Sequence, residues 1–150
     1  MSQTSRHSSG VLRLNMIEKL LSTNLTSDTI TFYRLKKLAS LAQTSEDHIS
    51  RLGMALSLAE GRIKPDWRPN LLSHENRDEI GPSTKQIKGR TLFKEELHIW
   101  MALTLRYQTP SDYEDWRQVL RAHWERGVQQ ISLRSFEEGD WIRTLNSILP

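Results

Sequence analysis

The stretch that decides the fold is Thr29–Gly61, which reads TITFYRLKKLASLAQTSEDHISRLGMALSLAEG. Apolar residues recur at three- and four-residue intervals on both sides of a polar interruption at Gln43–Ser45. This period is that of an amphipathic helix, so the stretch predicts two helices joined by a short turn. Gly61 stands where a left-handed residue commonly ends a helix. The predicted helical pair is the centre from which the rest of the fold is worked out.

Two more helices are predicted downstream. A broad apolar stripe over residues 92–107 predicts a third helix, which Pro110 follows. Ser111 and Glu114 form a capping box for a fourth helix, whose apolar face continues to Ile131. A short amphipathic segment then closes the chain.

Between the second and third helices, residues 61–91 show little periodicity and contain three prolines and three glycines. Loops of this length in compact domains usually carry a function or are disordered. This segment is also rich in cations, namely Arg62, Lys64, Arg68, Arg77, Lys85, Lys88 and Arg90.

Residues 16–26 are compatible with either a short helix or an extended ribbon. A strand before the helical pair would resemble a ribbon-helix-helix arrangement, in which two chains pair their strands. We therefore expect a mainly all-α, oligomeric fold of four to five helices with room for a short N-terminal β-ribbon. The expected organisation is a flexible segment over 1–24, a helical domain over 25–134 and a helical tail over 135–150.

Composition excludes several classes of protein. The chain has no cysteine, which removes disulfides, zinc–cysteine clusters, iron–sulfur clusters and thiol nucleophiles. No apolar run approaches the 18 or more residues of a membrane span, and residues 1–10 lack the apolar region of a secretory signal. We expect a soluble, cytoplasmic protein with no membrane partner.

Catalytic and metal motifs are weak. The five histidines show no pair at the i, i+4 spacing of a helical zinc site. Asp112, Glu114 and Asp115 are clustered, but acidic residues are also favoured at a helix N-terminus. No phosphate-binding glycine loop is present. We expect no catalytic residue, no metal site and no cofactor.

Charge is distributed unevenly. Residues 1–45 hold six basic and two acidic groups, whereas residues 91–150 hold seven basic and nine acidic groups. A basic front half is typical of a surface that faces a polyanion, although an ordinary solvated surface has the same composition. The densest basic group, and hence the candidate DNA-binding set, comprises Arg34, Lys36, Lys37, Arg51, Arg62 and Lys64.

Trp67 lies among cations in the sequence Lys64–Pro69. An aromatic ring in such a setting could stack on a base or sugar, or it could anchor the loop to the core. We favour the anchoring role.

The chain resembles the DndE family of bacterial DNA phosphorothioation (DNA sulfur modification) proteins. The resemblance covers residues 25–134 and is carried by the segments 35–61, 93–107 and 120–131. Its signatures are Arg51, Ala55, Leu56, Ser57 and Leu58 in the second helix, and His123, Arg126 and Gly127 in the fourth. Two departures are Leu52–Gly53, where the family usually has an aromatic residue after the arginine, and the longer, more basic loop at 61–91.

The resemblance implies a small helical homo-oligomer, a tetramer by analogy, that binds duplex or nicked double-stranded DNA and is not an enzyme. It would act beside sulfurtransferase-type and ATPase subunits of a modification system associated with restriction and bacterial defence. Three alternatives stay open: a sequence-specific ribbon-helix-helix regulator, a DNA-nicking enzyme, and an adaptor that binds only proteins.

Overall fold

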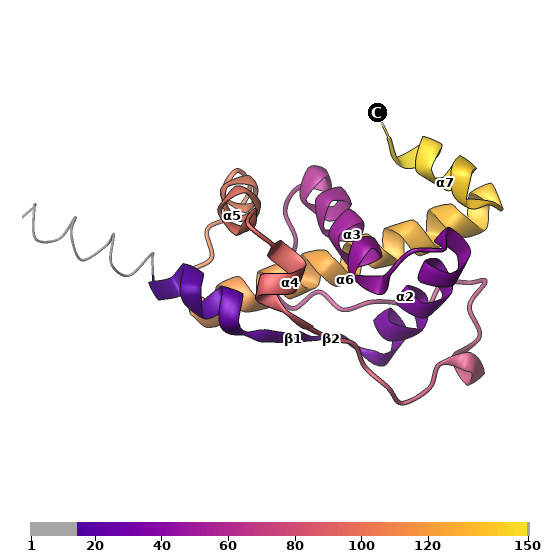
Figure 1. Cartoon of the computed structure of the whole chain (residues 1–150), viewed down its shortest axis with the longest axis horizontal. Coiled ribbons are helices and arrows are strands. Elements are labelled where there is room, and N and C mark those ends of the chain that lie inside the picture. Colours follow the sequence, from indigo (N-terminus) through magenta and orange to yellow (C-terminus); the bar gives the residue numbers. More distant parts are fainter. Residues whose placement is uncertain (1–14, 150) are drawn as a thin grey trace, which may run out of the picture.

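The computed structural model describes residues 15–149, which are mainly helical with one small two-stranded sheet. Figure 1 shows the long helix α6 (Tyr113–Glu138) running through the middle of the molecule along most of its length. Helix α3 (Glu46–Glu60) lies against it and makes the most extensive helix–helix contact of the fold. The mainly all-α fold class is confirmed, but residues 15–149 contain seven α-helices where four to five were expected.

The helical pair predicted over 29–61 is also confirmed. Helix α2 (Thr29–Ala42) ends at Gln43, which adopts the left-handed conformation. Helix α3 begins after Ser45, whose hydroxyl accepts the backbone N–H of His48, and ends at Gly61 with φ of 106°. These end structures are local, which explains why the sequence pattern predicts them well.

The prediction of one continuous third helix over residues 92–107 is wrong. The structure has α4 (Gly89–Phe93) and α5 (Leu97–Leu105), separated at Lys94, whose φ is 53°. The break allows Phe93 and Leu97 to enter the core together, with exposed fractions of 1% and 2%. The apolar residues predicted to form one continuous helical stripe are therefore divided between two helices, and both side chains next to the break are buried.

The structure contains a short strand before α2, and this strand pairs with another strand of the same chain. Strand β1 (Asn24–Thr26) pairs antiparallel with β2 (Gln86–Lys88), and Leu25 lies opposite Ile87. Both central side chains are buried. The strand before α2 thus exists, but its partner is a strand of the same chain from the segment predicted to be a loop.

The expected domain limits need two corrections. Residues 15–22 are helical, and Leu20 and Leu25 are both core residues, so the packed domain begins before residue 25. Residues 1–14 of the predicted flexible segment lie outside the described residues. At the other end, α6 continues to Glu138, past the expected limit at 134, before Gly139 and α7 (Trp141–Ile148).

The core is formed by one large cluster around Trp124 and Val128 of α6, with Leu35 of α2 and Met54 of α3. All four side chains are fully buried. Among the described residues, none of the helices combines the length and the apolar character needed to cross a bilayer.

Candidate nucleic-acid interface

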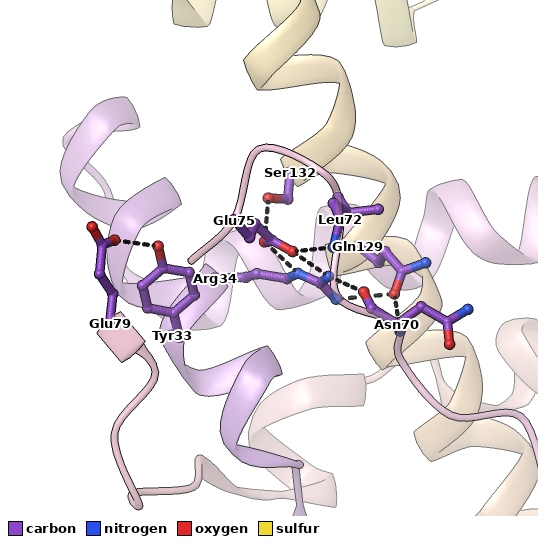
Figure 2. A network of polar contacts seen from close by, with 8 residues as sticks. All are labelled: Tyr33, Arg34, Asn70, Leu72, Glu75, Glu79, Gln129 and Ser132. Atoms are coloured by element: carbon purple, nitrogen blue, oxygen red, sulfur yellow. Dashed lines mark hydrogen bonds and ion pairs between the residues drawn. The ribbon is translucent and has the colours of Figure 1, made fainter. Parts of the chain in front are cut away.

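Arg34, one of the six predicted DNA contacts, is a buried residue of α2. Figure 2 shows its guanidinium enclosed by the loop that follows α3 and by α6. Its Nε and Nη2 donate to both carboxylate oxygens of Glu75, at 2.8 and 2.7 Å, and its Nη1 donates to Oε1 of Gln129 at 3.0 Å. The backbone carbonyl of Asn70 accepts a further bond from Nη2.

This geometry corrects the prediction for Arg34. The residue is 1% exposed, and its donors are already used by protein acceptors, so its guanidinium does not face a bound polyanion. An arginine is tolerated in a core only when a partner neutralises it and satisfies its hydrogen bonds. Arg34 therefore fixes the 70–75 loop to the helices.

Glu75 completes this network from the loop side. Burial raises its pKa, but hydrogen bonds from Arg34 and from the Leu72 N–H outweigh that effect and lower the pKa below its ordinary value. The glutamate is therefore ionised, and it also accepts a long bond of 3.4 Å from the Ser132 hydroxyl. The centre of the long loop is held in place by a buried ion pair.

Lys36 and Lys37, also on α2, are exposed and line a hollow of about 570 Å³. Nζ of Lys37 lies over the ring of Tyr33, 4.9 Å from its centroid, and is 3.3 Å from Oε2 of Glu79. Tyr33 and Glu79 raise the pKa of Lys37, although its partial burial acts in the opposite direction. Both lysines are accessible, but Lys37 already has an anionic neighbour.

Arg51 occupies a different place, at the junction of α3 and α4. Its Nη1 donates to the backbone carbonyl of Thr91 at 3.1 Å, and the residue is half-buried. Arg62 and Lys64 are exposed and lie beyond the end of α3. The six predicted cations are consequently distributed over separate places and do not form one continuous group.

Arg62 and Lys64 belong to a segment, residues 62–70, that packs along α6 and that we call the basic strap. Ile63 and Trp67 of the strap contact Val119 and Ala122 of α6 in a small apolar cluster. The expected anchoring role of Trp67 agrees with this packing. Because alternate strap residues face α6, the intervening cations Arg62, Lys64 and Arg68 are exposed.

Both ends of the strap are fixed by hydrogen bonds. Arg126 of α6 donates to the backbone carbonyls of Gly61 and Arg62, at 2.9 and 3.0 Å. At the far end, the Asn70 N–H donates to Gln129 at 2.9 Å. A segment without helix or strand hydrogen bonds is thereby held in a defined position on α6.

A second group of cations was missed by the sequence analysis. Arg68 of the strap and Arg117 and Arg121 of α6 line one pocket of about 280 Å³, together with Thr26 and Gln118. The two helix arginines are four residues apart, a spacing that places side chains on the same face. The four-residue spacing in the sequence could have indicated that Arg117 and Arg121 lie together. The position of Arg68 beside them depends on how the strap packs on α6, which the sequence does not reveal.

Four of the residues that carry the family resemblance, Ser57, His123, Arg126 and Gly127, meet at the contact between α3 and α6. The Ser57 hydroxyl accepts from Nε of Arg126 and lies 2.8 Å from Nδ1 of His123. Ser57 and His123 are 0% and 1% exposed, and burial with the nearby Arg126 charge lowers the pKa of His123 to about 4. A buried, neutral histidine bonded to a buried serine joins two helices and offers no access to a substrate.

Within residues 15–149 there is no group of three or more histidine, aspartate or glutamate side chains arranged to hold a metal ion. The chain matches no protein-family model, no curated protein and no solved structure.

Proposed function

We propose that this chain is a non-catalytic, DndE-like DNA-binding subunit of a bacterial DNA phosphorothioation system. It would act in the cytoplasm on duplex or nicked double-stranded DNA, beside sulfurtransferase-type and ATPase subunits. The observation that supports DNA binding is the basic strap, where Arg62, Lys64 and Arg68 are exposed on a segment fixed to α6. Cations on a rigid support can contact phosphates without a large ordering cost.

The resemblance supplies the particular system, and the structure supplies a physical reason for the residues that carry it. Ser57, His123, Arg126 and Gly127 hold α3, α6 and the start of the strap together. We therefore propose that these signature residues position the DNA-binding surface and do not themselves contact DNA.

Among the alternatives, the ribbon-helix-helix regulator is disfavoured by the pairing of β1. In that arrangement the strand pairs with a second chain, whereas here it pairs with β2 of its own chain. We also propose a homo-oligomer, a tetramer by the resemblance.

The proposal is tested by fluorescence anisotropy with intact, nicked and gapped duplexes of unrelated sequence at several salt concentrations. Phosphate contacts position a protein without reading sequence, so affinity should be similar across sequences. The variant Arg62→Ala/Lys64→Ala should weaken binding and reduce the slope of log affinity against log salt by roughly 1.8, or about 0.9 per lost contact.

The set Lys36, Lys37 and Arg51 is tested in the same assay as a separate triple alanine variant. An unchanged affinity and slope would remove those three residues from the interface and leave the strap. Failure of the wild-type chain to bind any duplex at low salt would contradict DNA binding and favour the adaptor. A footprint restricted to one palindrome would favour the regulator, and cleavage of intact duplex would favour the nicking enzyme.

A further inference from the structure

The pocket between the strap, α6 and β1 is lined by three arginines from two elements, namely Arg68, Arg117 and Arg121. We infer that this pocket binds a single phosphate group of a nucleic-acid backbone. This inference rests on the proposed function, because it assigns one specific phosphate contact to the proposed DNA-binding surface. None of the three residues belongs to the candidate set indicated by the sequence.

The protein balances the positive charge of these arginines only in part. Arg117 has a partner in Glu114, with Nη2 and Oε1 3.1 Å apart on successive helix turns. Neither Arg68 nor Arg121 has an ion-pair partner among residues 15–149. Like charges that converge without a counter-charge repel one another, so an anion in the pocket would relieve that repulsion.

One further carboxyl group lies close to the pocket and has to be counted. Glu125 is buried on α6, and its Oε1 accepts the Asp28 N–H at 2.9 Å. Burial raises its pKa to about 7, although Arg121 and Arg68 act to lower it. At neutral pH this group is only partly charged. The three arginines therefore still exceed the nearby negative charge when Glu114 and Asp28, which also acts on Glu125, are counted.

The chemistry of the lining indicates the kind of anion. Guanidinium groups present several donors in a planar fork that matches phosphate oxygens, and the Thr26 hydroxyl and the Gln118 amide can add further donors. A volume of about 280 Å³ is just below the range of organic-ligand pockets, roughly 300–1,000 Å³.

Within the described residues, the lining of this pocket contains no aromatic side chain on which a base could stack. The nearby Trp67 is packed against Ile63, Val119 and Ala122. A phosphate group therefore fits the lining better than a nucleoside does. Arg62 and Lys64 are exposed further along the same strap, which favours a phosphate within a polymer over a free ion.

The first experiment separates one shared phosphate from three independent contacts. Duplex binding is measured against salt for Arg68→Ala, Arg117→Ala, Arg121→Ala and the triple variant, with Arg143→Ala on α7 as the matched control. If one phosphate occupies the pocket, the triple variant should lower the log–log slope by roughly 0.9 and the affinity by at least about tenfold. Three separate phosphates would lower the slope by roughly 2.7 and would overturn the inference.

Circular dichroism and thermal melting of each variant identify changes that arise from misfolding. The conservative variant Arg121→Lys keeps the charge but loses the planar fork, so it should recover the salt slope and only part of the affinity. Unchanged DNA binding by the triple alanine variant would overturn the pocket assignment while leaving the proposed function standing.

The second experiment does not require DNA. Dimethyl phosphate and, separately, inorganic phosphate are titrated into the full chain while the arginine Nε–H signals are followed by NMR. We expect saturable shifts at Arg68, Arg117 and Arg121 and none at Arg143. Absence of those shifts, or equal shifts at Arg143, would overturn the pocket. Selective shifts in a chain that binds no duplex would show that the phosphate in the pocket does not come from a nucleic acid. That result would overturn this part of the inference and also the proposed function.

Discussion

Gly53 of α3 and Gly127 of α6 lie backbone to backbone where the two helices cross. A Cβ atom added to Gly127 would overlap the carbonyl oxygen of Gly53, and one added to Gly53 would lie 2.9 Å from the Val128 nitrogen. Both obstacles are main-chain atoms, which cannot rotate away as a side chain can. The two glycines therefore set the distance between the central helices.

Gly127→Ala should be strongly destabilising for this reason. Alanine is the better helix former by about 1 kcal/mol, but the overlap with Gly53 forces the helices apart. We expect a net loss of roughly 2 kcal/mol in the free energy of unfolding, measured by urea denaturation.

Gly81→Ala is the matched control, because a Cβ added at Gly81 meets no heavy atom within 4 Å. Its stability should change by less than about 0.5 kcal/mol. Equal effects of the two substitutions would show that the close helix crossing is not what Gly127 provides.

Arg34 and Glu75 should behave as a coupled, structural pair. Arg34→Met leaves a buried carboxylate without its counter-charge, and the expected loss is about 3–5 kcal/mol. The double variant Arg34→Met/Glu75→Gln removes both charges and should recover part of that loss. A double-mutant cycle in urea measures the coupling, and additive effects of the two changes would contradict it.

The same pair gives a signed pH dependence. Because the folded-state pKa of Glu75 is lowered, its contribution to stability is present above its ordinary pKa of 4.5 and is lost as the pH falls through the folded-state value. The Glu75→Gln variant should therefore lose less stability on acidification than the wild type does. Urea midpoints of both proteins, measured between pH 6 and pH 3, test this. An identical acid dependence in the variant would refute this.

Glu125 should act in the opposite direction. Burial raises its pKa from 4.5 to about 7, so its contribution to stability is complete below pH 4.5 and is lost as the pH rises through about 7. The difference is on the order of 3 kcal/mol. Glu125→Gln keeps an acceptor for the Asp28 N–H but cannot ionise. The stability of the variant minus that of the wild type should therefore be larger at pH 8 than at pH 5.

His123 also titrates differently in the folded state, because its pKa is lowered to about 4. Its contribution is present above pH 6.5 and is lost on acidification, so it opposes the effect of Glu125 in the wild type. Comparing Glu125→Gln with the wild type at each pH cancels the histidine contribution. If that difference in stability is constant from pH 5 to pH 8, the raised pKa of Glu125 is wrong.

The local parts of the fold could be predicted from the sequence, and the non-local parts could not. The period over Thr29–Gly61 and the residues at its ends depend on neighbours within four positions. The pairing of Leu25 with Ile87 joins three-residue strands far apart in the sequence, which are too short for an alternating pattern to reveal. The break at Lys94 depends on what Phe93 and Leu97 pack against.

The candidate site shows the same division. Density of cations in the sequence selected Arg34, but its burial depends on Glu75, 41 residues away. Conversely, Arg68, Arg117 and Arg121 are dispersed in the sequence and are brought to one pocket by the strap. Sequence reasoning identifies which residues carry charge, whereas packing decides which of those charges remain free to bind a ligand.

Helix α5 exposes several large apolar side chains, which makes it the candidate contact of the proposed homo-oligomer. Ile99, Leu103 and Leu105 are 50%, 36% and 51% exposed, and Tyr107 just beyond the helix is 49% exposed. Apolar side chains gathered on one short helix are more typical of an interface than of a free surface. We expect α5 to contact another copy of the chain.

Ile99→Glu/Leu105→Glu should lower the mass measured by light scattering towards that of the 17.5 kDa monomer. Charged groups at a buried apolar interface would lose their hydration without gaining partners, so association should weaken by orders of magnitude. Ile142→Glu on α7, at a residue that is 68% exposed, is the matched control and should leave the mass unchanged. A wild-type chain that is monomeric at micromolar concentration would rule out the homo-oligomer, and an oligomer that survives the double substitution would exclude α5 as its contact.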